Sequence, residues 1–76
     1  VRKIMFLIYT QPRCNYCLMA KRLLDEKGEA YMEIDITEDV DAKNKIRSLG
    51  FKTVPQIFYS DGKHFGDYEK LEKTYV

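Results

Sequence analysis

The stretch Gln11-Pro12-Arg13-Cys14-Asn15-Tyr16-Cys17 is the part of the sequence around which the chain is organised. It holds the only two cysteines, three positions apart. An apolar run over residues 4–9 precedes it, and a pattern typical of an amphipathic helix follows it. The order of strand, C-x-x-C and helix is the context in which a cysteine pair is expected to form a dithiol redox site.

The residues on either side of this stretch predict a strand and a helix. Residues 4–9 are apolar at nearly every position, as in a central strand covered on both faces. Residues 15–27 have helical spacing, and Gly28 is the expected end of the helix. Cys14 then lies at or just before the helix N-terminus, and Cys17 lies one turn inside. The buried stripe of this helix is expected to contain Cys17, Ala20, Leu23 and Leu24.

The middle of the chain predicts a second strand and a second helix. Residues 30–36 alternate loosely, as a strand does. Thr37 is the expected cap of a helix that continues to Leu49 and packs through Ala42, Ile46 and Leu49. A strand–helix–strand connection of this kind favours a parallel pair of strands.

The last third predicts a hairpin and a third helix. Asp61-Gly62 stands between two apolar runs, 56–59 and 63–65, which is a strong hairpin signal. Asp67 is the expected cap of a last helix that packs on the sheet through Tyr68, Leu71 and Tyr75. The whole chain is thus predicted as β-α-β-α-β-β-α, in one domain over residues 1–76.

Composition excludes several classes of protein. The 76 residues are 45% hydrophobic and 33% charged, which is typical of a folded chain. The net charge is +1 and the basic residues are scattered in the sequence, so we expect no nucleic-acid or membrane partner. No apolar run approaches the ~20 residues of a membrane span, and no secretory signal is visible. We therefore expect a cytoplasmic monomer.

Stability is a poor reason for the cysteine pair. A disulfide between Cys14 and Cys17 closes too short a loop to stabilise the fold much. Two other interpretations of the pair stay open. The cysteines could be half of a zinc site, although such sites usually need four ligands and the sequence has one histidine, His64. They could also be small buried side chains without chemistry. We expect His64 to be a solvent-facing hairpin residue, and the acidic residues Glu33, Asp35, Glu38, Asp39 and Asp41 to be solvated.

Three segments together resemble the glutaredoxins of the thioredoxin fold. Cys14-Asn15-Tyr16-Cys17 is similar to the family's C-P-Y-C motif, and residues 53–58 are similar to its T-V-P-Q-I-F segment. Residues 61–66 with Leu71 resemble the stretch that ends in the family's glycine-glycine motif. The resemblance covers nearly the whole chain and includes the short bacterial and phage members. It implies a four-stranded mixed sheet in the order 2-1-3-4, with three helices, an antiparallel hairpin and a cis peptide bond before Pro55.

The chemistry of exchange assigns different roles to the two cysteines. A free cysteine with a pKa of about 8.5 is only about 3% ionised at pH 7, and the thiolate is the reactive form. A helix N-terminus favours an anion at Cys14, and Arg13 adds positive potential. Cys17, deeper on the apolar stripe, is expected to keep its proton longer. We predict that Cys14 attacks the substrate disulfide and that Cys17 resolves the mixed disulfide.

The family resemblance also implies a glutathione site beside the cysteines. In the family, the position of Tyr16 lies in the pocket, the Val54 backbone pairs with the cysteinyl part of glutathione, and Thr53 and Pro55 shape the same wall. The residues predicted to bind glutathione are Gln11, Arg13, Tyr16, Thr53, Val54, Pro55, Gly66, Tyr68 and Glu69.

Three positions depart from the family's pattern. Gln11 stands where a lysine is frequent, with Arg13 as its expected substitute. The glycine pair is Gly66-Asp67, and residues 68–70 replace the polar and acidic residues that hold the γ-glutamyl end. Lys70 would repel the γ-glutamyl ammonium, whereas Glu69 could accept from it. These changes bear on glutathione affinity more than on dithiol chemistry.

We therefore expect a glutathione-dependent thiol–disulfide oxidoreductase that reduces protein or glutathione mixed disulfides, without a metal. Its expected partners are glutathione and disulfide-containing proteins; ribonucleotide reductase is a client implied by the resemblance alone. The alternative is a thioredoxin-like dithiol electron donor, reduced by a flavoprotein reductase, with little glutathione binding. Outside enzymes, the alternatives are a redox-inert adaptor on the same fold and a metal-binding module.

Overall fold

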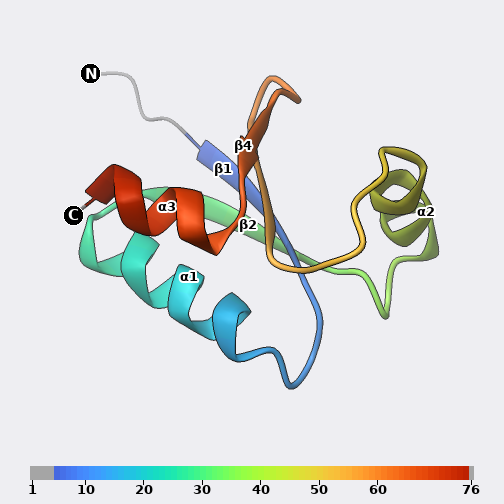
Figure 1. Cartoon of the computed structure of the whole chain (residues 1–76), viewed down its shortest axis with the longest axis horizontal. Helices are drawn as coiled ribbons and strands as arrows, with labels where there is room; N and C mark the ends of the chain where they lie inside the picture. Colours follow the sequence, from blue (N-terminus) through green and yellow to red (C-terminus); the bar gives the residue numbers. More distant parts are fainter. Residues whose placement is uncertain (1–4, 76) are drawn as a thin grey trace.

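The structure is a computed structural model that describes residues 5–75. The elements follow the predicted order (Figure 1): β1 (Met5–Thr10), α1 (Asn15–Glu26), β2 (Ala30–Asp35), α2 (Val40–Ser48), β3 (Gln56–Tyr59), β4 (His64–Gly66) and α3 (Tyr68–Tyr75). The predicted first strand began at Ile4, which lies outside the described residues. Within the part that the structure describes, no helix is long and apolar enough to cross a membrane.

The four strands form one mixed sheet in the order β2-β1-β3-β4, as predicted. Strand β1 pairs in parallel with β2 and antiparallel with β3, and β3 pairs antiparallel with β4. Figure 1 shows α1 and α3 together on one side of the sheet and α2 alone on the other. Strand β1 is therefore central and covered on both faces, which explains why nearly all its residues are apolar.

Successive residues of β1 supply two separate cores, because side chains of a strand alternate between faces. Phe6 and Ile8 pack with Ala20, Leu24 and Leu71 beneath α1 and α3. Tyr9 packs with Ala42, Ile46 and Phe58 beneath α2. Of the predicted stripe on α1, Cys17, Ala20 and Leu24 are buried and Leu23 is partly buried against the first core.

The predicted start of the second helix was wrong by two residues, whereas its predicted end at Leu49 lies within one residue of the observed end. The helix begins at Val40, and its cap is Asp39, whose carboxylate accepts from the Ala42 N–H at 3.0 Å. Thr37 instead donates its N–H and its hydroxyl to Asp35 Oδ1, at 2.8 and 2.6 Å, which makes a local turn. Leu49 lies just beyond the helix and is 53% exposed, so it is not a core residue.

The third helix begins and packs as predicted. The Asp67 carboxylate accepts from the Lys70 N–H at 3.1 Å, which satisfies one of the free donors of the first turn. Leu71 is fully buried, and Tyr68 and Tyr75 pack against the same core. These contacts place the first turn of α3 beside the first turn of α1, where the cysteines lie.

Candidate active site

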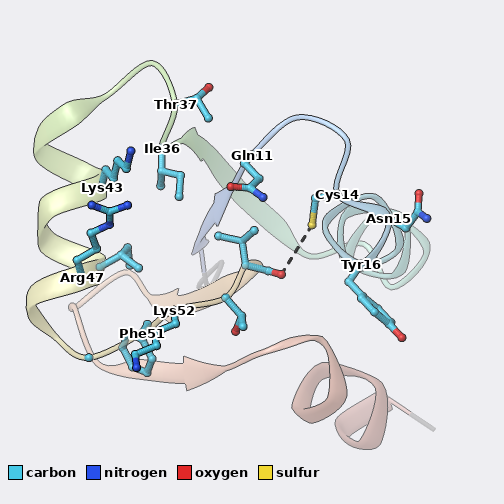
Figure 2. Close-up of a pocket in the computed structure, with 14 residues that line it drawn as sticks. Gln11, Cys14, Asn15, Tyr16, Ile36, Thr37, Lys43, Arg47, Phe51 and Lys52 are labelled. Carbon is cyan, nitrogen blue, oxygen red and sulfur yellow. Dashed lines mark hydrogen bonds between the residues drawn. The ribbon is translucent and has the colours of Figure 1, made fainter.

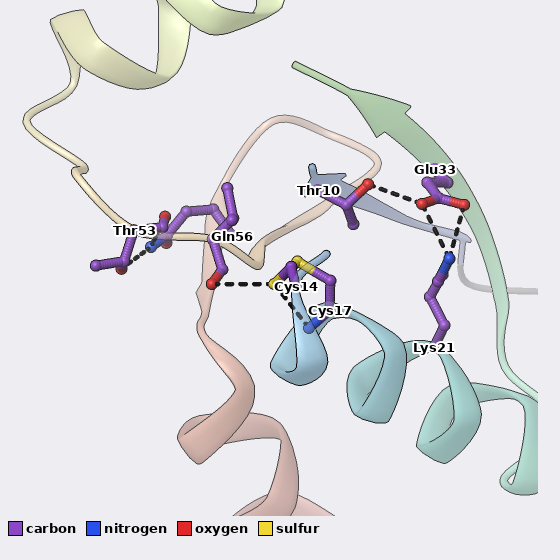
Figure 3. The surroundings of a disulfide bond; sticks show 8 residues. Thr10, Cys14, Cys17, Lys21, Glu33, Thr53 and Gln56 are labelled. Carbon is purple, nitrogen blue, oxygen red and sulfur yellow. Dashed lines mark hydrogen bonds and ion pairs between the residues drawn. A yellow bond between two sulfur atoms is a disulfide. The ribbon is translucent and has the colours of Figure 1, made fainter. Parts of the chain in front are cut away.

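The cysteine pair lies at the N-terminus of α1, directly after the central strand. Cys14 is the N-cap of the helix and Cys17 is in its first turn, and the two sulfurs form a disulfide (Figure 3). The Cys17 N–H donates to Cys14 Sγ at 3.1 Å. Cys17 is 2% exposed, whereas Cys14 is partly exposed. The predicted placement of both residues is confirmed, and only Cys14 offers a sulfur that a substrate can reach.

The loop that leads into the helix has an unusual backbone at Arg13. Its φ angle is 61°, in the left-handed region that residues other than glycine seldom adopt. Such positions are frequent at functional sites, where surrounding structure holds the backbone in place. The loop here must turn sharply between Thr10, at the end of β1, and Cys14, at the cap of α1.

A second loop, which leads into β3, lies next to the disulfide. The Val54 carbonyl oxygen lies 3.7 Å from Cys14 Sγ, and the Val54–Pro55 peptide bond is cis, as the resemblance implied. Residues 53–55 thus form a wall directly opposite the exposed sulfur.

Gln56 holds this wall in place, a role that the sequence interpretation missed. Its side chain is buried, and its amide nitrogen donates to Thr53 O at 2.9 Å and to Thr53 Oγ1 at 3.3 Å. Its amide oxygen lies 2.8 Å from His64 Nε2. His64 is exposed in the hairpin, as predicted, and its ring also stacks on Phe51, with ring centroids 4.3 Å apart.

We expect Gln56→Ala to lower the free energy of unfolding by about 1–2 kcal/mol, because it removes the hydrogen bonds that the buried Gln56 amide makes to Thr53 and to His64. Urea denaturation measures the loss. Gln11→Ala, at an exposed glutamine beside the same site, serves as the control and should change stability by less than about 0.5 kcal/mol. Equal losses of stability in the two variants would contradict the role of Gln56 in holding the wall of residues 53–55.

Behind the disulfide, a polar group joins three elements (Figure 3). The buried Thr10 hydroxyl donates to Glu33 Oε2 at 2.7 Å, and Lys21 Nζ lies 3.0 Å from the same oxygen. The Thr10 hydrogen bond, reinforced by Lys21 and opposed by partial burial, holds the pKa of the Glu33 carboxyl below its ordinary value of 4.5. Glu33 is exposed, as predicted, and its carboxylate is also bound by Thr10 and Lys21.

This lowered pKa predicts a pH-dependent contribution to stability. A carboxyl whose pKa is lower in the folded chain stabilises it above pH ~4.5, and this contribution is lost as pH falls through the folded-state value. We expect Glu33→Gln to destabilise the protein at pH 7 by about 0.5–1 kcal/mol, since the pair is partly screened. The difference from wild type should shrink progressively as the pH falls below about 4.5 in urea titrations. Glu38→Gln, at an exposed loop carboxylate, is the control; a Glu33→Gln deficit that is constant with pH would contradict the assignment.

Two cavities lie along the wall, and Cys14 lines the larger of them. The larger, of about 890 Å³, lies between the cysteine loop and α2, and Figure 2 shows side chains from both elements around it. The smaller, of about 360 Å³, lies toward α3. Tyr16 contributes to both, and its ring lies 5.6 Å from that of Tyr68, centroid to centroid.

The predicted glutathione residues are distributed over these cavities. The larger cavity is lined by Gln11, Tyr16, Thr53 and Val54. The smaller is lined by Tyr16, Thr53, Val54, Pro55, Tyr68 and Glu69. Arg13 lines a third hollow, of about 270 Å³, that also borders Gln11, Cys14 and Cys17. Gly66 lies with His64 in another, of about 430 Å³.

Three basic residues at the larger cavity were not singled out from the sequence. Lys43 and Arg47 come from α2, and Lys52 comes from the loop before the wall. The prediction that basic residues are scattered therefore fails at this place. The available signal was the spacing of Lys43 and Arg47, one helical turn apart on the same face. Lys52 has no such signal, because only the fold brings it to them.

The sequence and the structure were compared with those of known proteins. The Glutaredoxin family profile matches residues 6–65. Glutaredoxin 1 of Rickettsia conorii is 46% identical over 68 residues, which cover 86% of this chain and 66% of that protein. The chain thus spans just under two thirds of the length of this relative.

Two solved structures extend the comparison. The solution structure of glutaredoxin from Brucella melitensis is 34% identical, with a TM-score of 0.79 over 96% of this chain and 79% of that one. The NrdH-redoxin of Escherichia coli, described as a glutaredoxin-like protein with a thioredoxin-like activity profile, has a TM-score of 0.80 over 95% and 93% of the two chains. Its identity of 21% shows a shared fold and no more.

The family match runs from the first strand to the hairpin and includes both the cysteine pair and the Pro55 wall. Those are the two segments that the structure brings together at the exposed sulfur. The chain therefore belongs to the glutaredoxin family, and Cys14 and Cys17 are its redox pair.

Proposed function

We propose that this chain is a glutathione-dependent thiol–disulfide oxidoreductase that reduces protein and glutathione mixed disulfides. One observation carries the proposal: Cys14 is partly exposed at a helix N-terminus and lines a large cavity, and Cys17 is buried in the first turn behind it. This arrangement suits a two-step exchange, in which one thiol meets the substrate and the other waits inside.

The two steps follow from this geometry. The Cys14 thiolate attacks one sulfur of the substrate disulfide, forms a mixed disulfide, and releases the other sulfur as a thiolate that takes up a proton. Cys17 then loses its proton and attacks Cys14 Sγ, which forms the Cys14–Cys17 disulfide and releases the second substrate thiol. Two glutathione thiols return the pair to the dithiol and leave as glutathione disulfide. Each turnover thus moves two electrons and two protons.

The local groups favour Cys14 as the attacking residue. The Cys17 N–H points at Cys14 Sγ, and a hydrogen bond to sulfur stabilises the thiolate more than the thiol. The helix N-terminus acts in the same direction. Cys17, at 2% exposure, cannot meet a bulky substrate without opening of the helix start.

In this proposal, glutathione lies along the wall of Thr53, Val54 and Pro55, with its sulfur at Cys14. Gln11 and Arg13 serve the glycine end, Tyr16 covers the sulfur, and the γ-glutamyl end lies near Gly66, Tyr68 and Glu69. The proposed setting is the cytoplasm, where glutathione is kept reduced. We further propose that residues 1–76 form one domain, which acts as a monomer on disulfide-containing proteins, with ribonucleotide reductase as one candidate client.

One observation favours a second candidate function. Asp67, Glu69 and Glu72 line the smaller cavity, and no lysine or arginine lines it within residues 5–75. These carboxylates would repel the γ-glutamyl carboxylate of glutathione. The competing proposal is a thioredoxin-like donor that a flavoprotein reductase reduces, in line with the activity profile stated for the NrdH-redoxin neighbour.

Steady-state reduction of a small glutathione mixed disulfide separates the two candidates. The assay uses glutathione as the sole reductant, with wild type and Cys17→Ser in parallel. Turnover by both variants is the expected result, since Cys14 and glutathione suffice for this substrate. Failure of both, together with reduction of a protein disulfide by wild type when a thioredoxin reductase is supplied, would replace the first proposal by the second.

A further inference from the structure

The larger cavity carries a charge pattern that the proposed exchange does not by itself require. Lys43, Arg47 and Lys52 line it, and no aspartate or glutamate does so among the residues described. We call these three residues with their cavity the basic cavity. Within residues 5–75, none of the three takes part in an ion pair. Figure 2 shows Lys43 and Arg47 on the side of α2 that faces Cys14.

The positive charges around the basic cavity repel one another, and an anion bound among them would lower this repulsion. Lys43 and Arg47 lie one helical turn apart, so their like charges repel each other until a counter-charge arrives. The cavity also borders Cys14, Tyr16, Thr53 and Val54, so whatever fills it lies next to the reacting sulfur. Its volume of about 890 Å³ is near the upper limit of ~300–1,000 Å³ for small-molecule sites, which leaves room for several residues of a peptide.

The opposite end of the wall has the opposite sign. Asp67, Glu69 and Glu72 border the smaller cavity, and we call them the acidic wall. An acidic segment of a substrate would be attracted to the basic cavity, at the Thr53 end of the wall, and repelled from the smaller cavity, at the Pro55 end. The groove therefore distinguishes on which side of the reacting cysteine a substrate carries its negative charge.

We propose that the preferred substrates are disulfides of proteins that carry acidic residues directly after the reacting cysteine. A substrate paired antiparallel with residues 53–55, in the manner of a β-strand, places its residues after the cysteine in the basic cavity and its residues before the cysteine at the acidic wall. Carboxylates that follow the cysteine then lie among Lys43, Arg47 and Lys52. This inference rests on the proposed exchange at Cys14 and adds the substrate class to it.

Peptide disulfides test the inference without glutathione. The prereduced protein is mixed with the symmetric disulfide of a capped peptide: Ala-Ala-Cys-Asp-Asp, Asp-Asp-Cys-Ala-Ala or Ala-Ala-Cys-Ala-Ala. In each reaction two electrons and two protons pass from the Cys14–Cys17 dithiol to the peptide, which leaves as two thiols. Each rate constant is divided by that of the same peptide with dithiothreitol, because neighbouring carboxylates also change the intrinsic reactivity of a disulfide.

We expect the peptide with acidic residues after cysteine to react about tenfold faster than the neutral one at low salt, and the reverse order to react more slowly than the neutral one. The advantage should shrink at 0.5 M salt. Replacing Lys43, Arg47 and Lys52 together by glutamine should bring the ratio close to one. Lys63→Gln, at a cation of the hairpin turn outside both cavities, is the control and should leave the ratio unchanged.

Equal rates for all three peptides, a preference for the reversed order, or a preference that survives the triple substitution would overturn the inference while the exchange function stands. Absence of reaction with every peptide, in protein that reacts with dithiothreitol after oxidation, would overturn the proposed function and the inference with it. The neutral peptide thus separates a failure of the chemistry from a failure of the charge preference.

Discussion

Cys14→Ser is expected to abolish disulfide reduction, with a loss on the order of 10³-fold or more. A serine hydroxyl is not appreciably ionised at neutral pH and does not attack sulfur, so the first covalent step has no nucleophile. Cys17 cannot replace it, because its sulfur is buried at 2% exposure behind the first helical turn. The loss should be in kcat as well as in kcat/KM.

The measurement is the reduction of a glutathione mixed disulfide with glutathione as reductant, and Cys17→Ser is the matched control. Both substitutions exchange sulfur for oxygen at neighbouring positions, and both remove the disulfide, so differences in stability largely cancel. Cys17→Ser should still turn over, because glutathione resolves its mixed disulfide; without glutathione it should stop as a mixed disulfide that mass spectrometry detects. Activity in Cys14→Ser together with its absence in Cys17→Ser would reverse the assigned roles.

Gly66→Ala is expected to lower the free energy of unfolding by about 3 kcal/mol. Gly66 ends β4 with a φ angle of 152°, a conformation that residues with a side chain rarely adopt. A Cβ at this position would lie 2.6 Å from the Lys70 Cβ and 2.7 Å from its Cγ. The Lys70 Cβ is fixed by the first turn of α3, so the backbone must move, and the start of α3 must move with it.

Gly28→Ala is the control for this experiment. Gly28 also has a positive φ angle, of 70°, but a Cβ there would have no atom within 4 Å. It should therefore show only the backbone part of the effect, about 1 kcal/mol. Urea denaturation of both variants separates the two contributions. Equal losses would mean that the contact with Lys70 is relieved at little cost.

The order of elements could be predicted from the sequence because local signals agree with the fold. The apolar run of β1, the change of period after Cys14, and Asp61-Gly62 each indicate one element without help from the rest. The second helix was misplaced because two capping residues compete. Thr37 and Asp39 are both good caps, and the choice depends on Asp35, which binds Thr37 and ends the strand in a turn.

The candidate site could be predicted only where its residues are neighbours in the sequence. Cys14 and Cys17 are one helical turn apart, and their placement follows from that spacing. The Gln56–His64 contact joins two strands through a bulged pairing, and its position depends on the register of the hairpin. Lys52 reaches Lys43 and Arg47 only through the loop that follows α2. Such groups of residues are brought together by tertiary structure, and no local sequence pattern predicts them.

The difference in exposure between the two cysteines bears on how fast the proposed mixed disulfide at Cys14 is resolved by Cys17. In the disulfide form the Cα atoms of Cys14 and Cys17 lie 5.2 Å apart, so in the proposed mixed disulfide with a client Cys17 would start close to Cys14. Its local concentration is that of a group in the same molecule and does not vary with the cell's supply of small thiols. The lifetime of a bound client is then fixed by how readily the first turn of α1 lets Cys17 turn toward its neighbour. The rate of client release would then depend on the protein itself and not on the concentration of glutathione.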